Sequence, residues 1–196
     1  MLSSDFIGFD SRAQEIALIH AAQKGHENVV KYLMDKGVSI AGISDAQLTP
    51  FVLAAQNGHL GVVNVILEEH PEVIDQQDEM GKCTALIRSA RKGQSEVVNL
   101  LLRKGANPNI QSDNGNTALM LAVNNGYLDI VDNLLGNNAN IYLKNSQEVT
   151  AVEIADHLAD NSDRSLIKLE LDKVCGRIPE NKSYSTLVSQ TQSLEL

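Results

Sequence analysis

Apolar and polar positions recur along this chain with a period close to 33 residues. The separations between five stretches rich in alanine and apolar residues are 33, 35, 33 and 33. These stretches open at Ile16, Thr49, Thr84, Thr117 and Thr150. A glycine marker and an apolar-pair marker keep the same phase through the first four units, at Gly25, Gly58, Gly93 and Gly126 and at Val29, Val62, Val97 and Ile130. The sequence therefore predicts a tandem repeat.

Each unit has the pattern of two short helices joined by a turn. Thr49 can cap a helix whose first turn contains Pro50, and Gly58 ends that helix after about two turns. An apolar stripe from Val62 to Leu67 then predicts a second, longer helix. Because such a pair cannot bury its apolar faces alone, the units must stack as an all-α solenoid. The two additional residues between the second and third units lie within residues 68–83, which we expect to form a connecting loop.

The repeated segments resemble the ankyrin repeat, whose signature includes T-P-L-H-x-A. The matching stretches are TPFVLAA, TALIRSA, TALMLAV and the degenerate IALIHAA, followed by GHENVV, GHLGVV, GQSEVV and GYLDIV. The resemblance covers roughly residues 13–160 and implies an ankyrin-repeat solenoid of four repeats plus a degenerate fifth, C-terminal capping repeat, with short β-turn or hairpin connections.

The chain departs from the family where the signature has histidine. We expect packing to replace the hydrogen bonds of that histidine at all five positions. These positions are Ile19, Val52, Ile87, Met120 and Glu153.

The predicted organisation has three parts. Residues 1–12, with Phe6, Ile7 and Phe9, form an N-terminal capping segment; residues 13–175 form the repeat domain; and residues 176–196 form a flexible polar tail. The predicted repeats span approximately 13–43, 44–78, 79–111, 112–144 and the capping unit 145–175.

Charge and composition exclude several classes of protein. Sixteen Lys and Arg against 25 Asp and Glu give a net charge of −9, which argues against nucleic-acid binding. The first residues resemble no signal peptide, and no segment is apolar enough to insert into a membrane. Cys83 and Cys175 have neither disulfide nor zinc-ligand spacing. We therefore expect a monomeric cytoplasmic protein, or alternatively one secreted into a host cell's cytoplasm without an N-terminal signal peptide.

The sequence contains no recognisable catalytic, cofactor-binding or metal-binding motif. The five histidines lack metal-ligand spacing, and His26 and His59 share one repeated slot, which favours a structural role in the turn between helices. The glycines recur once per repeat and form no phosphate-binding loop. Cys83 is a candidate for an exposed thiol. We predict a protein without enzymatic activity, cofactor or metal.

Candidate partner-binding residues follow from helical spacing and from the resemblance. Side chains four, seven and eight positions after each opening residue lie on one helix face, and in ankyrin proteins this concave face and the turns carry recognition. The predicted residues are His20, Gln23, Lys24, Leu48, Leu53, Gln56, Asn57, Arg88, Arg91, Lys92, Asp113, Asn114, Asn116, Leu121, Asn124 and Asn125. Arg88, Arg91 and Lys92 form a basic cluster that suits an acidic peptide. The alternative is that these long cationic side chains only keep an exposed helix face hydrated and bind no partner.

The leading interpretation is an adaptor or scaffold that binds a protein through this face. One alternative is a stoichiometric inhibitor of a partner enzyme. Another is a bacterial effector delivered into host cells by a signal in the Ser/Thr-rich C-terminal tail.

Overall fold

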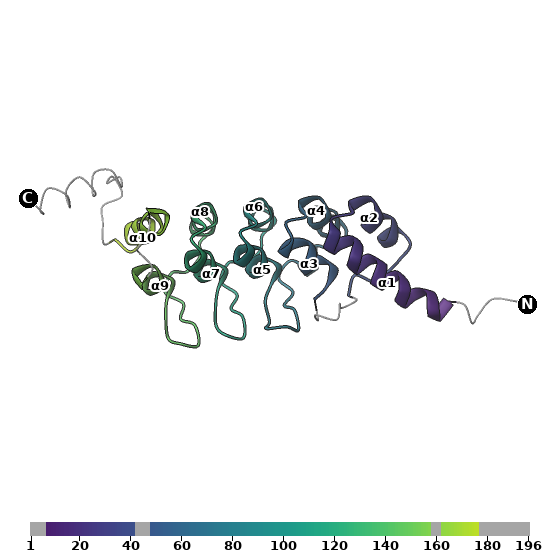
Figure 1. Ribbon diagram of the computed structural model, residues 1–196, viewed down its shortest axis with the longest axis horizontal. Coiled ribbons are helices and arrows are strands. Elements are labelled where there is room, and N and C mark those ends of the chain that lie inside the picture. Colours follow the sequence, from purple (N-terminus) through teal and green to yellow (C-terminus); the bar gives the residue numbers. More distant parts are fainter. Residues whose placement is uncertain (1–6, 42–47, 158–161, 177–196) are drawn as a thin grey trace, which may run out of the picture.

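The computed structural model describes residues 7–41, 48–157 and 162–176, and these form a row of stacked helix pairs (Figure 1). The inner helices are α1 (Ile7–Lys24), α3 (Pro50–Gln56), α5 (Ala85–Lys92), α7 (Ala118–Asn125) and α9 (Ala151–His157). The outer helices are α2 (Glu27–Asp35), α4 (Leu60–Glu69), α6 (Ser95–Arg103), α8 (Leu128–Gly136) and α10 (Ser162–Val174). Within these ranges there is no β-strand, so the prediction of an all-α repeat solenoid is confirmed. The predicted tail beyond Gly176, and Phe6, lie outside the described residues.

Threonine caps start the central inner helices, as the sequence predicts. The Oγ1 atoms of Thr49, Thr84 and Thr117 each accept a hydrogen bond from the backbone N–H three residues later, at 3.2–3.3 Å. This bond satisfies one of the unpaired donors of a helix N-terminus and fixes where each helix begins.

The first inner helix is longer than the repeat pattern predicts. Helix α1 runs without a break from Ile7 to Lys24, so the predicted boundary between residues 12 and 13 lies inside it. The reason is that Ile16 occupies the position of the capping threonine. Isoleucine supplies no capping oxygen, and the preceding Arg-Ala-Gln-Glu favours helix, so the helix continues upstream.

Neighbouring repeats interlock at the turn between the inner and outer helices. Gly93 has φ of +75°, and a Cβ atom placed on it would lie 2.8 Å from the ring of Tyr127 in the next repeat. In the preceding repeats, His59 and Gln94 occupy the position equivalent to Tyr127. Nε2 of His59 donates to the carbonyl oxygen of Gln23 at 2.8 Å, and Nε2 of Gln94 donates to that of Gln56 at 3.2 Å. The predicted structural role of His59 is therefore confirmed.

Side-chain amides also link the loops that project beside the inner helices (Figure 1). Nε2 of Gln77 donates to the carbonyl oxygens of Lys82 in its own loop, at 2.7 Å, and of Gln111 in the next, at 3.0 Å. Gln111 repeats this pattern with Gly115 at 2.6 Å and Lys144 at 2.8 Å. These bonds hold successive hairpin loops in register.

The two additional residues lie in the connection between the second and third repeats, as predicted. One is taken up before the hairpin loop, where a short 3-10 helix, Pro71–Val73, follows α4. The other lengthens the hairpin tip. The backbone N–H of Asp78 bonds to Cys83, five residues on, whereas Ser112 and Asn145 bond to residues only four positions away. The stack of helices continues past both insertions.

Packing replaces the missing signature histidines in four of the five units. Ile19, Val52, Ile87 and Met120 are all buried. At the C-terminal end, helix α10 packs against α8 and α9 and buries Ile167 and Leu171, which agrees with the predicted capping role.

Candidate protein-interaction surface

The exposed ends of the inner helices form one surface, which we call the inner-helix face. It is defined by the exposed residues Gln23, Lys24, Asn57, Arg91, Lys92, Asn124 and Asn125. His20 is exposed beside it, whereas Gln56 and Leu121 are half-buried. The predicted helical offsets thus place most candidate side chains on an accessible surface.

Two apolar candidates are not on this surface, and that part of the prediction is wrong. Leu53 and Leu48 are each only 4% exposed and pack with Ile19 and Val52 in a small second core. Leu53 and His20 both lie four positions after the opening residue of their repeat, and His20 is exposed. Leu53 is buried because Leu48, just before α3, packs against it. Neither leucine can anchor a partner from this position.

Arg88 is likewise buried, so the predicted cluster of three exposed cations is reduced to two. Its Nε lies 2.7 Å from Oδ2 of Asp78, and the two side chains are 9% and 0% exposed. Its Nη2 also donates to the carbonyl oxygen of Met80. Asp78 in turn accepts the backbone N–H of Cys83 at 3.2 Å through Oδ1. Arg88 therefore holds the longer hairpin tip in place.

The candidates in the hairpin loop before α7 are divided between exposed side chains and a side chain that joins two loops. The backbone N–H of Asp113 donates to Gly81 at 2.9 Å, and the carbonyl of Asn114 accepts from Ser146 at 3.0 Å. Their side chains are exposed. Oδ1 of Asn116 accepts from Asn145 at 3.1 Å. The exposed side chains of Asp113 and Asn114 extend the candidate surface onto the loops, whereas Asn116 joins two loops.

In the three central repeats, charge is segregated between the inner and the outer helices. Inner helices α3, α5 and α7 contain no acidic residue, and their charged residues are Arg88, Arg91 and Lys92. The outer helices α4, α6 and α8 contain five acidic residues and the single basic residue Arg103. Arg88 is buried and paired with Asp78. The exposed charges at the centre of the inner-helix face are therefore those of Arg91 and Lys92.

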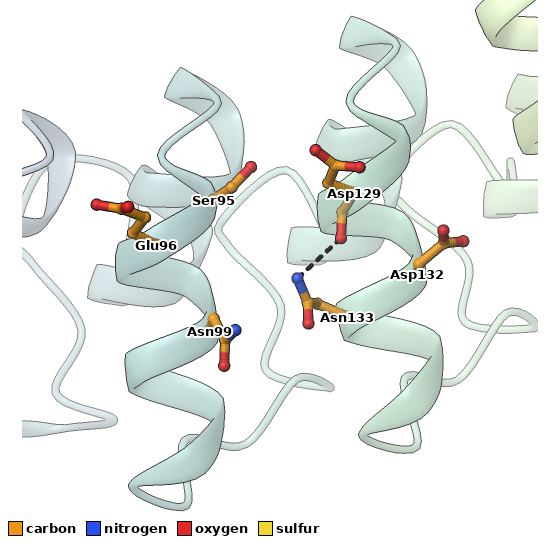
Figure 2. Close-up of a pocket in the computed structure, with 6 residues that line it drawn as sticks. All are labelled: Ser95, Glu96, Asn99, Asp129, Asp132 and Asn133. Atoms are coloured by element: carbon orange, nitrogen blue, oxygen red, sulfur yellow. Dashed lines mark hydrogen bonds between the residues drawn. The ribbon is translucent and has the colours of Figure 1, made fainter.

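An acidic groove lies on the opposite side of the stack, between α6 and α8 (Figure 2). It has a volume of about 470 Å³ and is lined by Ser95, Glu96, Asn99, Asp129, Asp132 and Asn133. Burial, with the nearby Glu170 and Asp129 carboxylates, raises the pKa of Asp132 above its ordinary value. Among the described residues, no group of His, Cys, Asp and Glu has the arrangement of a metal site.

Cys83 does not have the environment of an activated nucleophile. This cysteine is buried, not exposed as its position in a turn suggests, and burial raises the pKa of its thiol. A raised thiol pKa lowers the thiolate fraction that a nucleophile requires. None of the described helices has the length and apolar character needed to cross a membrane.

Glu153 stands at the position of the signature histidine and forms a reciprocal N-terminal cap with Thr150 at the start of α9. The Thr150 N–H donates to Oε2 of Glu153 at 2.8 Å, and the Glu153 N–H donates to Oγ1 of Thr150 at 3.3 Å. The hydrogen bond from the Thr150 backbone lowers the pKa of Glu153 below its usual value of 4.5.

We expect Glu153→Gln to lower the melting temperature at pH 7. The difference in melting temperature from the unaltered chain is expected to shrink progressively as the solution is acidified. A carboxyl group with a lowered folded-state pKa stabilises the fold above its unfolded pKa, and this contribution is lost as the pH falls through the folded value. Melting curves between about pH 3 and 7 test this. The exposed Glu69 at the end of α4 provides the control variant Glu69→Gln. A melting difference for Glu153→Gln that stays constant with pH contradicts the capping role.

Comparison with known proteins agrees with this architecture. The family model for ankyrin repeats (3 copies) matches residues 4–78 and 72–145. An ankyrin repeat-containing protein of Treponema pallidum (strain Nichols) is 32% identical over 133 residues, which cover 68% of this chain and 44% of that protein. The fowlpox virus ankyrin repeat protein FPV031 is 32% identical over 146 residues, covering 70% and 42% respectively. The ankyrin repeat and KH domain-containing protein mask-1 of Caenorhabditis elegans is 35% identical over 139 residues, 71% of this chain and 5% of that protein. The chain thus spans less than half the length of these relatives.

Proposed function

Because the chain belongs to the ankyrin-repeat family, whose repeats generally mediate protein–protein interaction, we propose that it is a non-catalytic adaptor or scaffold that binds a protein partner through the inner-helix face. The observation that carries this proposal is the absence of acidic residues from α3, α5 and α7 in a chain of net charge −9. A surface that keeps a positive centre within an acidic protein favours an acidic partner segment.

Arg91 and Lys92 provide the charge of this site, and the amides beside them provide hydrogen-bonding groups. Arg91 and Lys92 lie in the last turn of α5, where the helix dipole also favours cations. Nδ2 of Asn125 donates to the carbonyl oxygen of Arg91 at 3.2 Å. This bond uses the backbone of Arg91 and does not involve its guanidinium group. Long cationic side chains flanked by exposed amides suit carboxylates of an extended segment. We place this function in the cytoplasm, where Cys83 and Cys175 stay reduced.

The double variant Arg91→Glu, Lys92→Glu tests the proposal. We expect it to bind the partner at least tenfold more weakly than the unaltered chain, because attraction becomes like-charge repulsion. A pull-down from cell extract, followed by titration calorimetry with the purified partner, measures the loss. Raising the salt concentration is expected to weaken binding of the unaltered chain.

A control variant is available in the same repeat. Arg103 and Lys104 are exposed at the end of outer helix α6, so Arg103→Glu, Lys104→Glu makes the same change of charge away from the inner-helix face. Its affinity is expected to stay within about twofold of the unaltered chain. Arg88 is left unchanged because its removal disturbs the core. Equal retention of the partner by both double variants would place the binding site elsewhere.

A further inference from the structure

The first helix pair exposes apolar side chains that resemble an uncovered repeat interface. Ile16 on α1 is 47% exposed, and Val29 and Tyr32 on α2 are 46% and 60% exposed. Val29 and Tyr32 are three residues apart, so they lie on one face of α2.

The same positions are buried in the next two repeats. Val62, Val97 and Ile130 are equivalent to Val29 and are at most 1% exposed. Val65 and Leu100 are equivalent to Tyr32 and are 9% and 7% exposed, and in the fourth repeat this position is the half-buried, polar Asn133. The outer helices stack in the order α2, α4, α6 and α8, so each later helix has a predecessor beside it. Among the described residues, α2 has no helix in that place.

The two ends of the array therefore differ. Helix α10 closes one end by packing against α8 and α9 (Figure 1). At the other end, α2 continues the row of repeat interfaces with a face that is built like the buried ones and that the described residues leave exposed. An apolar helix face of this kind is completed by another helix that packs its own apolar residues against it.

Charge favours a second copy of this chain as that neighbour. Residues 7–36 contain four acidic residues, Asp10, Glu15, Glu27 and Asp35, and four basic residues, Arg12, Lys24, Lys31 and Lys36. This segment is electrically neutral although the whole chain carries −9. Two copies approaching through their α2 helices thus meet without net like-charge repulsion between these segments, and a twofold axis perpendicular to the helices makes them antiparallel, so that their dipoles oppose.

We propose that the chain self-associates through this end, by pairing of the α2 faces that contain Val29 and Tyr32 about a twofold axis. A few half-exposed apolar side chains offer less area than the roughly 800 Å² per partner of a stable dimer, so the expected Kd is on the order of 100 μM. At concentrations well below this Kd the protein is then monomeric, as expected from the sequence. This surface is separate from the inner-helix face, so it leaves that face available to a partner.

Sedimentation velocity over about 10 μM to 1 mM tests the proposal. The mass of the unaltered chain is expected to rise toward that of a dimer, and to do so also at high salt because the contact is apolar. The variant Val29→Glu, Tyr32→Glu is expected to weaken dimerisation at least tenfold. Because both side chains are exposed, its melting temperature is expected to match that of the unaltered chain.

Two apolar residues elsewhere that are at least half-exposed provide the control. Tyr142 is 66% and Val174 55% exposed, and the variant Tyr142→Glu, Val174→Glu adds the same charge. This control is expected to dimerise like the unaltered chain. A mass that stays monomeric up to 1 mM, or dimerisation that survives the Val29→Glu, Tyr32→Glu change, overturns the proposal. Both results are independent of the Arg91 and Lys92 binding test.

Discussion

Arg88→Met is expected to lower the free energy of unfolding by about 3–5 kcal/mol, because it leaves a buried carboxylate without its cation. Asp78 is fully buried and lies 2.7 Å from Nε of Arg88. Methionine conserves much of the aliphatic volume but offers no donor to Asp78 or to the carbonyl oxygen of Met80. The longer hairpin tip loses its attachment at the same time. Denaturant unfolding monitored by circular dichroism measures the change.

The matched control lies one turn further along the same helix. Arg91 is exposed, so Arg91→Met is expected to change stability by no more than about 0.5 kcal/mol. The double change Asp78→Leu, Arg88→Met removes both charges and is expected to recover part of the loss. Similar effects for Arg88→Met and Arg91→Met would mean that the ion pair adds nothing to the fold.

Ala55→Leu is expected to destabilise the array by about 1–3 kcal/mol through overpacking. Ala55 is 0% exposed, on a helix that packs against α1, α4 and α5. Three additional carbon atoms at this position force the helices apart or push the leucine out of a favourable rotamer. Thermal unfolding detects the loss.

Its neighbour provides the comparison. Gln56 is half-buried, and its backbone carbonyl is the group that accepts from Gln94. Gln56→Ala retains that carbonyl and is expected to lie within about 0.5 kcal/mol of neutral. Equal melting shifts for Ala55→Leu and Gln56→Ala would contradict the division between core and surface.

The repeat, the helix order and the caps were predictable because they depend on local pattern. A threonine followed by an alanine-rich stretch and a glycine specifies a capped helix and its end wherever it occurs, as Thr84 and Gly93 show. The length of α1 does not follow from the repeat pattern, because residues 1–12 lie upstream of the first repeated stretch. The absence of a capping oxygen at Ile16 was the available signal.

The candidate surface was predictable only in part, since burial of a helix position depends on the loop beside it. Leu53 and Arg88 have the same helical offset as His20, which is exposed. Leu48 packs against Leu53, and the hairpin tip at Asp78 and Met80 binds Arg88. One clue is present in the sequence: Thr84 lies six positions after Asp78, whereas Thr117 lies only five positions after Ser112. What the longer tip contacts requires the three-dimensional arrangement.

The hydrogen bonds between repeats have a consequence for how such a surface can evolve. His59, Gln94 and Asn125 all donate to backbone carbonyl oxygens, those of Gln23, Gln56 and Arg91. Every residue type has that oxygen, so mutation of the accepting side chain leaves the bond in place. Selection for a new partner can therefore change the side chains of the accepting residues while these bonds between repeats are kept, whereas Asn125 serves both the inner-helix face and the bond. At the accepting residues, the side chain is available for specificity and the backbone maintains the spacing of the helices.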